Sequence, residues 1–161
     1  MLYKIAYYIF KLSPSIKKFF WKKWYTIFAN KVSNHDLRFM NYGYSSSDLH
    51  VKLNEEDEKN RYPIQLYHHV ASQINLKGLK VLEIGSGRGG GCAYIASYLK
   101  PAEMLGLDFS PSVVKLCDAI YTLENLKFIQ GDAENLPFKD NAFDAVINVE
   151  SSHCYASMDT F

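Results

Sequence analysis

The 161-residue sequence lacks cysteine pairs, long apolar runs and a strong net charge, and each absence excludes a class of protein. Cys92, Cys117 and Cys154 are widely spaced and form no CxxC pair, which argues against a disulfide framework or a zinc site. No apolar run approaches the roughly 20 residues that cross a bilayer. The formal net charge of +1 gives no case for nucleic acid as a partner. The sequence therefore predicts a cytoplasmic globular protein without a metal site.

Acidic residues are absent from the first 35 positions, which hold seven lysines. Ser13-Pro14 is a helix N-cap pair, so it predicts a break followed by a second helix. Apolar residues recur at helical spacing from Ile16 to Phe28 and share one face, with the lysines elsewhere. Such a face is suited either to packing over the rest of the chain or to an anionic membrane surface. The sequence leaves both open, and peripheral membrane contact through residues 1–30 is one expectation.

Residues 80–91 form the stretch around which the rest of the sequence is organised. A short apolar strand from Val81 to Ile84, interrupted by Glu83, leads into a glycine-rich turn that opens a helix. A turn of this kind, at the carboxyl end of a parallel strand, is where open α/β sheets bind ligands. Glycine lets the backbone approach a ligand closely, and the amides that begin the helix would face that ligand.

Strands and helices alternate after this stretch, which predicts an α/β fold with a mostly parallel sheet flanked by helices. The predicted strands after the first are Met104–Asp108, Leu126–Gln130 and Phe143–Val149. The predicted helices lie at residues 61–74, 92–99 and 110–121. The first of these helices is expected to bury one apolar face, which comprises Leu66, Tyr67, Val70 and Ile74.

Four successive strands each end in polar residues: Glu83, Asp108, Asp132 and the region 148–153. Because the carboxyl ends of parallel strands lie along one edge of a sheet, these groups are expected to converge on one crevice. A glycine turn and several acids at such an edge indicate an adenosine-type cofactor. The pattern Gly85-x-Gly87-x-x-Gly90 also matches the dinucleotide fingerprint, so a nicotinamide-dependent oxidoreductase is an alternative.

Two acids favour a different cofactor from a dinucleotide. Glu83 stands two residues before the first glycine, where it suits a cationic amino group better than a pyrophosphate. Asp132 lies in Gly131-Asp132-Ala133, where it suits an adenine amino group. No Gly-Lys-Ser/Thr follows the turn, which excludes a P-loop.

The motifs across residues 80–150 resemble those of the class I methyltransferases that use S-adenosylmethionine (SAM). The resemblance rests on Glu83-x-Gly85-x-Gly87-x-Gly89, on Asp108, on the segment Gly131–Phe138 and on the strand Phe143–Val149. It implies a Rossmann-like class I methyltransferase fold with SAM as the cofactor. The segment Asn41-Tyr42-Gly43-Tyr44 is similar to the lid of members that act on small molecules and lipids.

The resemblance also implies roles for individual residues. Glu83 and the backbone of Gly85 and Gly87 would hold the methionine end of SAM, and the Asn148 carbonyl would help to bind its amino group. Asp108 would accept both ribose hydroxyls, and Phe109 would pack on the adenine. Asp132 and the Ala133 amide would read the adenine edge, and the lid residues are Asn41 and Tyr42.

A narrower resemblance covers roughly residues 36–161, on Arg88–Gly91, Gly131–Phe138 and Asn148–Tyr155. It is to the phthiotriolone/phenolphthiodiolone dimycocerosate methyltransferases, and it implies O-methylation of a hydroxyl on a lipid, a polyketide or another small molecule.

An alcohol acceptor must lose its proton, and three residues beyond the fourth strand are candidates to take it. An imidazole is suited to this task near neutral pH, so His153 is the candidate general base. An equal alternative is that His153 only lines the pocket. Glu150 and Tyr155 are weaker candidates.

The resembled fold has seven strands, whereas this sequence supplies four, in the expected order 3-2-1-4. We therefore expect a chain truncated after strand 4, whose fourth strand is an exposed edge. Residues 1–60 are expected to form an aromatic, basic helical cap and lid, and residues 61–161 the SAM-binding domain. A SAM-binding fragment without catalysis is a second alternative, and nothing in the sequence bears on oligomers.

Overall fold

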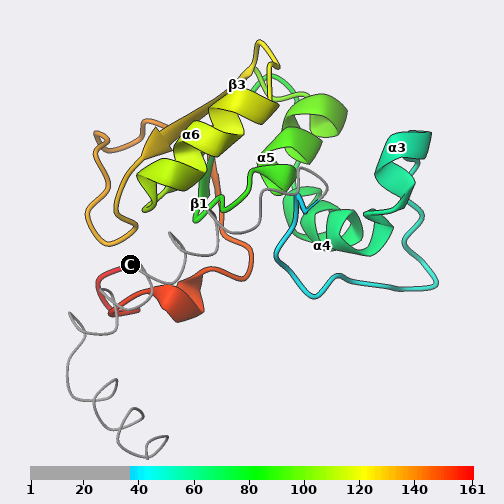
Figure 1. Cartoon of the computed structure of the whole chain (residues 1–161), viewed down its shortest axis with the longest axis horizontal. Helices are drawn as coiled ribbons and strands as arrows, with labels where there is room; N and C mark the ends of the chain where they lie inside the picture. Colours follow the sequence, from blue (N-terminus) through cyan, green and yellow to red (C-terminus); the bar gives the residue numbers. More distant parts are fainter. Residues whose placement is uncertain (1–36) are drawn as a thin grey trace, which may run out of the picture.

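The computed structural model describes residues 37–161, and its centre is a four-stranded sheet of order β3-β2-β1-β4 (Figure 1). All three strand pairs are parallel. The strands are β1 (Lys80–Ile84), β2 (Glu103–Asp108), β3 (Leu126–Gln130) and β4 (Ala145–Ile147). The predicted α/β class and strand order are confirmed.

Helices precede and connect the strands in the alternating order that the sequence predicted. They are α3 (Glu55–Glu58), α4 (Arg61–Ala71), α5 (Gly90–Tyr94) with its π-helical continuation η1 (Ile95–Leu99), α6 (Pro111–Ile120) and the 3-10 turn η2 (Ser152–Cys154). In Figure 1, α5 and α6 lie in front of the strands, and α3 and α4 lie to the right. Helix α6 begins at Ser110-Pro111, the N-cap and first-turn pair.

Two core clusters lie on opposite faces of the sheet, because neighbouring residues of a strand point to opposite faces. Val81 and Met104 point to the face that α4, α5 and α6 cover. Leu82 and Leu107 point to the other face, where residues of loops pack against them; these include Ala133, Phe138, Phe143 and Tyr155. In residues 37–161 the helices that contribute to the core therefore cover one face, and loops cover the other.

Helix α4 ends earlier than predicted and turns a different face inward. It stops at Ala71, whereas the apolar pattern had suggested Ile74. Ile64, Tyr67 and Ala71 are buried, and Val70 is 37% exposed. Of the four apolar residues whose spacing predicted the helix, Tyr67 is buried and Leu66 is half-buried, whereas Val70 is exposed and Ile74 lies beyond the end of the helix.

Strand β4 is also shorter than predicted, with three residues in place of the seven from Phe143 to Val149. It pairs with β1, and among the described residues no strand pairs with its other edge. Val146 is 58% exposed there, as expected for an edge strand. No helix within residues 37–161 combines the length and the apolar character needed to cross a membrane. The predicted helices and membrane contact of residues 1–30 lie outside the described residues.

The approach of α5 to α4 and to the sheet depends on two glycines. A Cβ on Gly106 in β2 would lie 2.6 Å from Phe128 Cδ1 and 2.8 Å from Cys92 Sγ. A Cβ on Gly91 in α5 would lie 2.0 Å from Tyr67 Cε1. Any larger side chain at either position would push α5 away from its neighbours.

We predict that Gly91→Ala destabilises the protein by about 1–3 kcal/mol, because the added methyl group overlaps the Tyr67 ring. In an unobstructed helix the same change stabilises by roughly 1 kcal/mol, so the sign of the effect is diagnostic. Urea denaturation measures it, and a Gly91→Ala protein at least as stable as the parent would contradict the packing.

Candidate functional site

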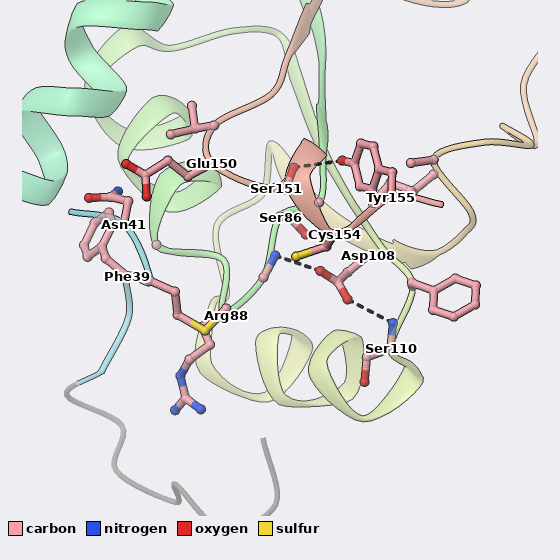
Figure 2. Close-up of a pocket in the computed structure, with 18 of the residues that line it drawn as sticks. Phe39, Asn41, Ser86, Arg88, Asp108, Ser110, Glu150, Ser151, Cys154 and Tyr155 are labelled. Atoms are coloured by element: carbon pink, nitrogen blue, oxygen red, sulfur yellow. Dashed lines mark hydrogen bonds between the residues drawn. The ribbon is translucent and has the colours of Figure 1, made fainter. Parts of the chain in front are cut away.

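A cavity lies at the carboxyl edge of the sheet, where the turn after β1, the end of β2 and the loops after β3 and β4 meet (Figure 2). Residues of segment 37–44, which precedes α3, also line the cavity. The cavity lining includes nine candidate residues from the sequence: Asn41, Gly85, Gly87, Asp108, Phe109, Asp132, Ala133, Glu150 and Tyr155. Segments far apart in the chain therefore converge on one site, as the topology of a parallel sheet requires.

The glycine turn after β1 has a backbone that other residues rarely adopt. Gly85 has φ +74° and Gly87 has φ +51°. A Cβ on Gly85 would lie 2.4 Å from Ser151 Oγ, and one on Gly87 would lie 2.8 Å from Met40 Cε. The Gly85 and Ser86 amides both donate to Leu107 O, at 2.8 and 3.0 Å. The turn is therefore folded back against the end of β2, with no room for side chains at these glycines.

Asp108 ends β2 and holds the turns on either side of it. Its Oδ2 accepts from the Gly87 amide at 2.9 Å, and its Oδ1 accepts from the Ser110 amide at 2.9 Å (Figure 2). Burial raises the pKa of the Asp108 carboxyl, and the backbone donors act in the opposite direction. Phe109 lines the cavity beside it. Each carboxylate oxygen can accept a further hydrogen bond from a ligand.

The loop after β3 presents a short polar turn to the cavity. Asp132 Oδ1 accepts from the Glu134 amide at 3.1 Å, and the Asn135 amide donates to Asp132 O at 3.0 Å. Ala133 lies between the two acids, and all three residues line the cavity. The turn thus places backbone amides and carboxylates side by side, as recognition of a nucleobase edge requires.

Glu83 does not line the cavity, although the sequence placed it at the cofactor. It is fully buried beneath the site, where Oε1 accepts from Tyr67 OH at 2.6 Å and Oε2 from Cys92 Sγ at 2.8 Å. Desolvation raises the pKa of Glu83 to about 7, against the lowering effect of the two donors. Tyr67 does line the cavity, so Glu83 acts on the site through Tyr67. The helical spacing of Tyr67 signalled its burial but not this partner.

Asn148 lies just outside the cavity lining. Its Nδ2 donates to Ile84 O at 3.0 Å and reaches Ser151 Oγ at 2.8 Å. The residues that follow it, Val149 and Glu150, line the cavity. The structure therefore brings the Asn148 side chain to β1, next to the site rather than into it.

His153 is exposed and is not among the lining residues, whereas its neighbours Cys154 and Tyr155 are. It lies in η2, a 3-10 turn with three residues per turn, so consecutive side chains point about 120° apart. The spacing that brings Ser151 and Cys154 to the cavity turns His153 away from it. The structure therefore does not bring this candidate base into the site.

Segment 37–44 is held to the rest of the domain by backbone hydrogen bonds and by several of its side chains. Arg88 Nε donates to Leu37 O, and the Gly90 amide donates to Arg38 O at 3.2 Å. Further hydrogen bonds join Asn41 Nδ2 to Pro63 O, the Tyr42 amide to Glu150 and the Tyr44 amide to Tyr62 O. The Arg38 side chain also pairs with Asp57, and the rings of Phe39 and Tyr44 pack against Tyr67 and His69. Of the two expected lid residues, Asn41 lines the cavity, and Tyr42 is 98% exposed and does not.

Sequence reasoning missed Arg38, Phe39 and Met40, which line the cavity with Asn41. The aromatic-glycine pattern of residues 39–44 predicted a lid or a turn, but it did not predict which residues of the segment would face the glycine turn.

The cavity contains a buried polar atom that has no hydrogen-bond partner within residues 37–161. Ser86 is 4% exposed, lines the cavity, and its Oγ has no hydrogen-bond partner among residues 37–161. A ligand with a polar group at this point would satisfy the hydroxyl. No group of histidine, cysteine or acidic residues within the described chain could hold a metal ion. The lining therefore fits an organic, polar ligand with a nucleoside part.

We predict that Glu83→Gln changes how stability depends on pH. A carboxyl whose pKa rises from 4.5 to about 7 on folding contributes stability that is full below pH 4.5 and is lost as the pH rises through 7. The stability of Glu83→Gln relative to the parent should increase by about 3 kcal/mol over this range, since one pKa unit is worth about 1.4 kcal/mol. Urea denaturation at several pH values measures this difference. The exposed Glu124→Gln is the control, and parallel curves for Glu83→Gln and the parent would contradict the prediction.

Comparisons with known proteins agree with this geometry. Residues 81–160 match a family model described as a methyltransferase domain. The phthiotriol/phenolphthiotriol dimycocerosates methyltransferase of Mycobacterium leprae is 42% identical over 150 residues, which are 92% of this chain and 56% of that protein. The fatty-acid O-methyltransferase of Mycolicibacterium smegmatis is 44% identical over 138 residues, which are 85% and 50% of the two chains. The chain thus spans about half the length of these curated relatives.

A solved structure supports the same assignment at the level of the fold. The YcgJ protein from Bacillus subtilis aligns with a TM-score of 0.55 at 25% identity, over 59% of this chain and 42% of that one. The matched domain contains the glycine turn, Asp108 and the polar turn at Asp132, which are the residues that carried the resemblance in the sequence. The chain belongs to the methyltransferases through the domain at residues 81–160.

Proposed function

We propose that the protein is an O-methyltransferase that moves the methyl group of SAM to a hydroxyl of a lipid, a polyketide or another small molecule. The observation that carries this proposal is the convergence of the Gly85–Gly87 turn, Asp108 and the turn at Asp132 on one cavity. The names of the two curated relatives support a lipid acceptor, because both name a lipid and a methyltransferase.

The residues of the cavity fit the cofactor part by part. Asp108 has the acceptor capacity for two ribose hydroxyls, and Phe109 offers a ring beside them. Asp132 and the Ala133 amide suit the adenine edge. The Gly85–Gly87 turn, with the unpaired Ser86 Oγ, suits the methionine end. Three carboxylates that line the cavity also suit a cationic ligand: Asp108, Asp132 and Glu134.

When bound, SAM supplies an electrophilic methyl group on a sulfonium. The chain then has to orient the acceptor oxygen, exclude water and take up the hydroxyl proton. Segment 37–44 is suited to be the lid of the site, with residues 61–161 as the domain that binds SAM. The basic and aromatic residues of positions 1–30 would suit an anionic membrane surface of the cytoplasm, where lipid acceptors partition; this part rests on the sequence.

We assign the uptake of the hydroxyl proton to Glu150 in preference to His153. The Glu150 side chain lines the cavity, and its backbone has φ +49°, a strained conformation of the kind that gathers at functional sites. His153 is outside the lining, which argues against the role expected for it.

Asp108→Ala should weaken SAM binding about tenfold to a hundredfold, because a bound ligand loses hydrogen bonds worth about 1–3 kcal/mol. Isothermal titration with SAM measures the change, and Asp118→Ala, on the exposed side of α6, is the control. Unchanged affinity would remove Asp108 from the site. A protein that binds NAD but not SAM would contradict the whole proposal.

Glu150→Gln should lower the turnover of a long-chain alcohol at least tenfold, because the general base is lost. The affinity for SAM should stay within about twofold, because the residues proposed to bind SAM are unchanged. His153→Gln is the matched control and should keep its turnover. The reverse pattern would restore His153 as the base. A parent protein that binds SAM but methylates none of a panel of alcohols would instead be a SAM-binding protein without this activity.

A further inference from the structure

The last carbonyl of β1 lies where its pairing with β4 stops. The register pairs Glu83 with Ile147, and β4 ends there. Beyond that point the Ile84 carbonyl is contacted by three side chains of the segment after β4. Asn148 Nδ2 lies at 3.0 Å, Ser151 Oγ at 3.1 Å and Tyr155 OH at 3.5 Å. Side chains therefore continue the link between the two strands after the backbone ladder has ended.

The same three side chains are also bound to one another. Asn148 Nδ2 lies 2.8 Å from both Ser151 Oγ and Tyr155 OH, and these two hydroxyls are 2.8 Å apart (Figure 2). An amide nitrogen has two hydrogens, so Asn148 divides them among the two hydroxyls and the Ile84 carbonyl. The Tyr155 phenol carries a hydrogen to donate at neutral pH, and burial raises its pKa further. The cluster is hence a closed network with the carbonyl as its anchor.

The network borders the glycine turn directly. A Cβ on Gly85 would lie 2.4 Å from Ser151 Oγ and 3.0 Å from Tyr155 OH. Ser151 and Tyr155 line the cavity, whereas Asn148 lies behind them. The two hydroxyls thus occupy the space beside Gly85 and leave its backbone facing the cavity. Any movement of the segment after β4 would be transmitted to the first residue of the turn.

We infer that Asn148, Ser151 and Tyr155 are positioning residues that fix the Gly85–Gly87 turn in the conformation that binds SAM, and that they act through the Ile84 carbonyl. This inference rests on the proposed use of the turn for SAM. It concerns the Asn148 side chain, whereas the resemblance in the sequence implied a contact of the Asn148 carbonyl with the cofactor. Its consequence is that the cofactor cradle and the loop on the acceptor side form one unit.

The test compares three conservative variants, Asn148→Ala, Ser151→Ala and Tyr155→Phe, with the control Ser152→Ala. Ser152 follows Ser151 in the chain, but it is outside the lining and makes none of the network's contacts. We expect Asn148→Ala to raise the Kd for SAM about tenfold and the hydroxyl variants about threefold or more, with Ser152→Ala unchanged. A double variant, Asn148→Ala with Tyr155→Phe, should lose less than the sum of the single effects, because the residues act as one network.

Amide hydrogen exchange gives a second readout that needs no cofactor. The amides of Gly85 and Ser86 should exchange about tenfold faster in Asn148→Ala, while those between β2 and β3 keep their rates. A uniform increase across the sheet, or a lowered melting temperature with an unchanged Kd, would reduce the network to general stability and overturn the inference. A parent protein that fails to bind SAM would refute the proposed function. The inference that the network holds this turn for SAM would fall with it, whatever the exchange rates.

Discussion

The architecture of the site depends on the carboxylate of Asp108. This side chain stands at the end of β2, and its two oxygens hold the Gly87 amide on one side and the Ser110 amide on the other. The turn after β1 and the start of α6 are therefore joined by a single residue of the strand between them. A carboxylate in this position also places negative charge near the N-termini of α5 and α6, where the positive end of each helix dipole favours it. Three successive elements thus meet at one point because one side chain accepts from two of them.

A second buried acid organises the layer below. Glu83 has no water to solvate it, so its charge depends on donors supplied by two helices: Tyr67 from α4 and Cys92 from α5. Cys92 reaches the strand because Gly106 leaves room for it in β2. Glu83 therefore connects both helices to β1, and the Tyr67 side chain that donates to it also lines the cavity.

Features that depend on local pattern could be predicted from the sequence, and those that depend on distant partners could not. Asp108 and the glycine turn could be identified from the pattern of strand residues and from the spacing of the glycines and acids. The order of the four strands could be predicted from the alternation of strands and helices. The place of His153 depended on a 3-10 turn too short to leave a periodic signal. Glu83 and Asn148 were found as residues, but their bonds to Tyr67 and Ile84 join positions 16 and 64 apart in the chain, for which one sequence holds no information.

The way in which segment 37–44 is attached has a consequence for how the site can change. Leu37, Arg38, Tyr42 and Tyr44 are attached through main-chain atoms of the segment, and the side chains of Arg38 and Asn41 add bonds to Asp57 and to Pro63 O. Met40 and Tyr42 are 40% and 98% exposed. Substitution at Tyr42, which does not line the cavity, would alter the surface that an incoming acceptor meets while every main-chain hydrogen bond of the segment persists. Proteins of this kind can therefore differ in the acceptor they select while the cavity proposed for the cofactor stays the same.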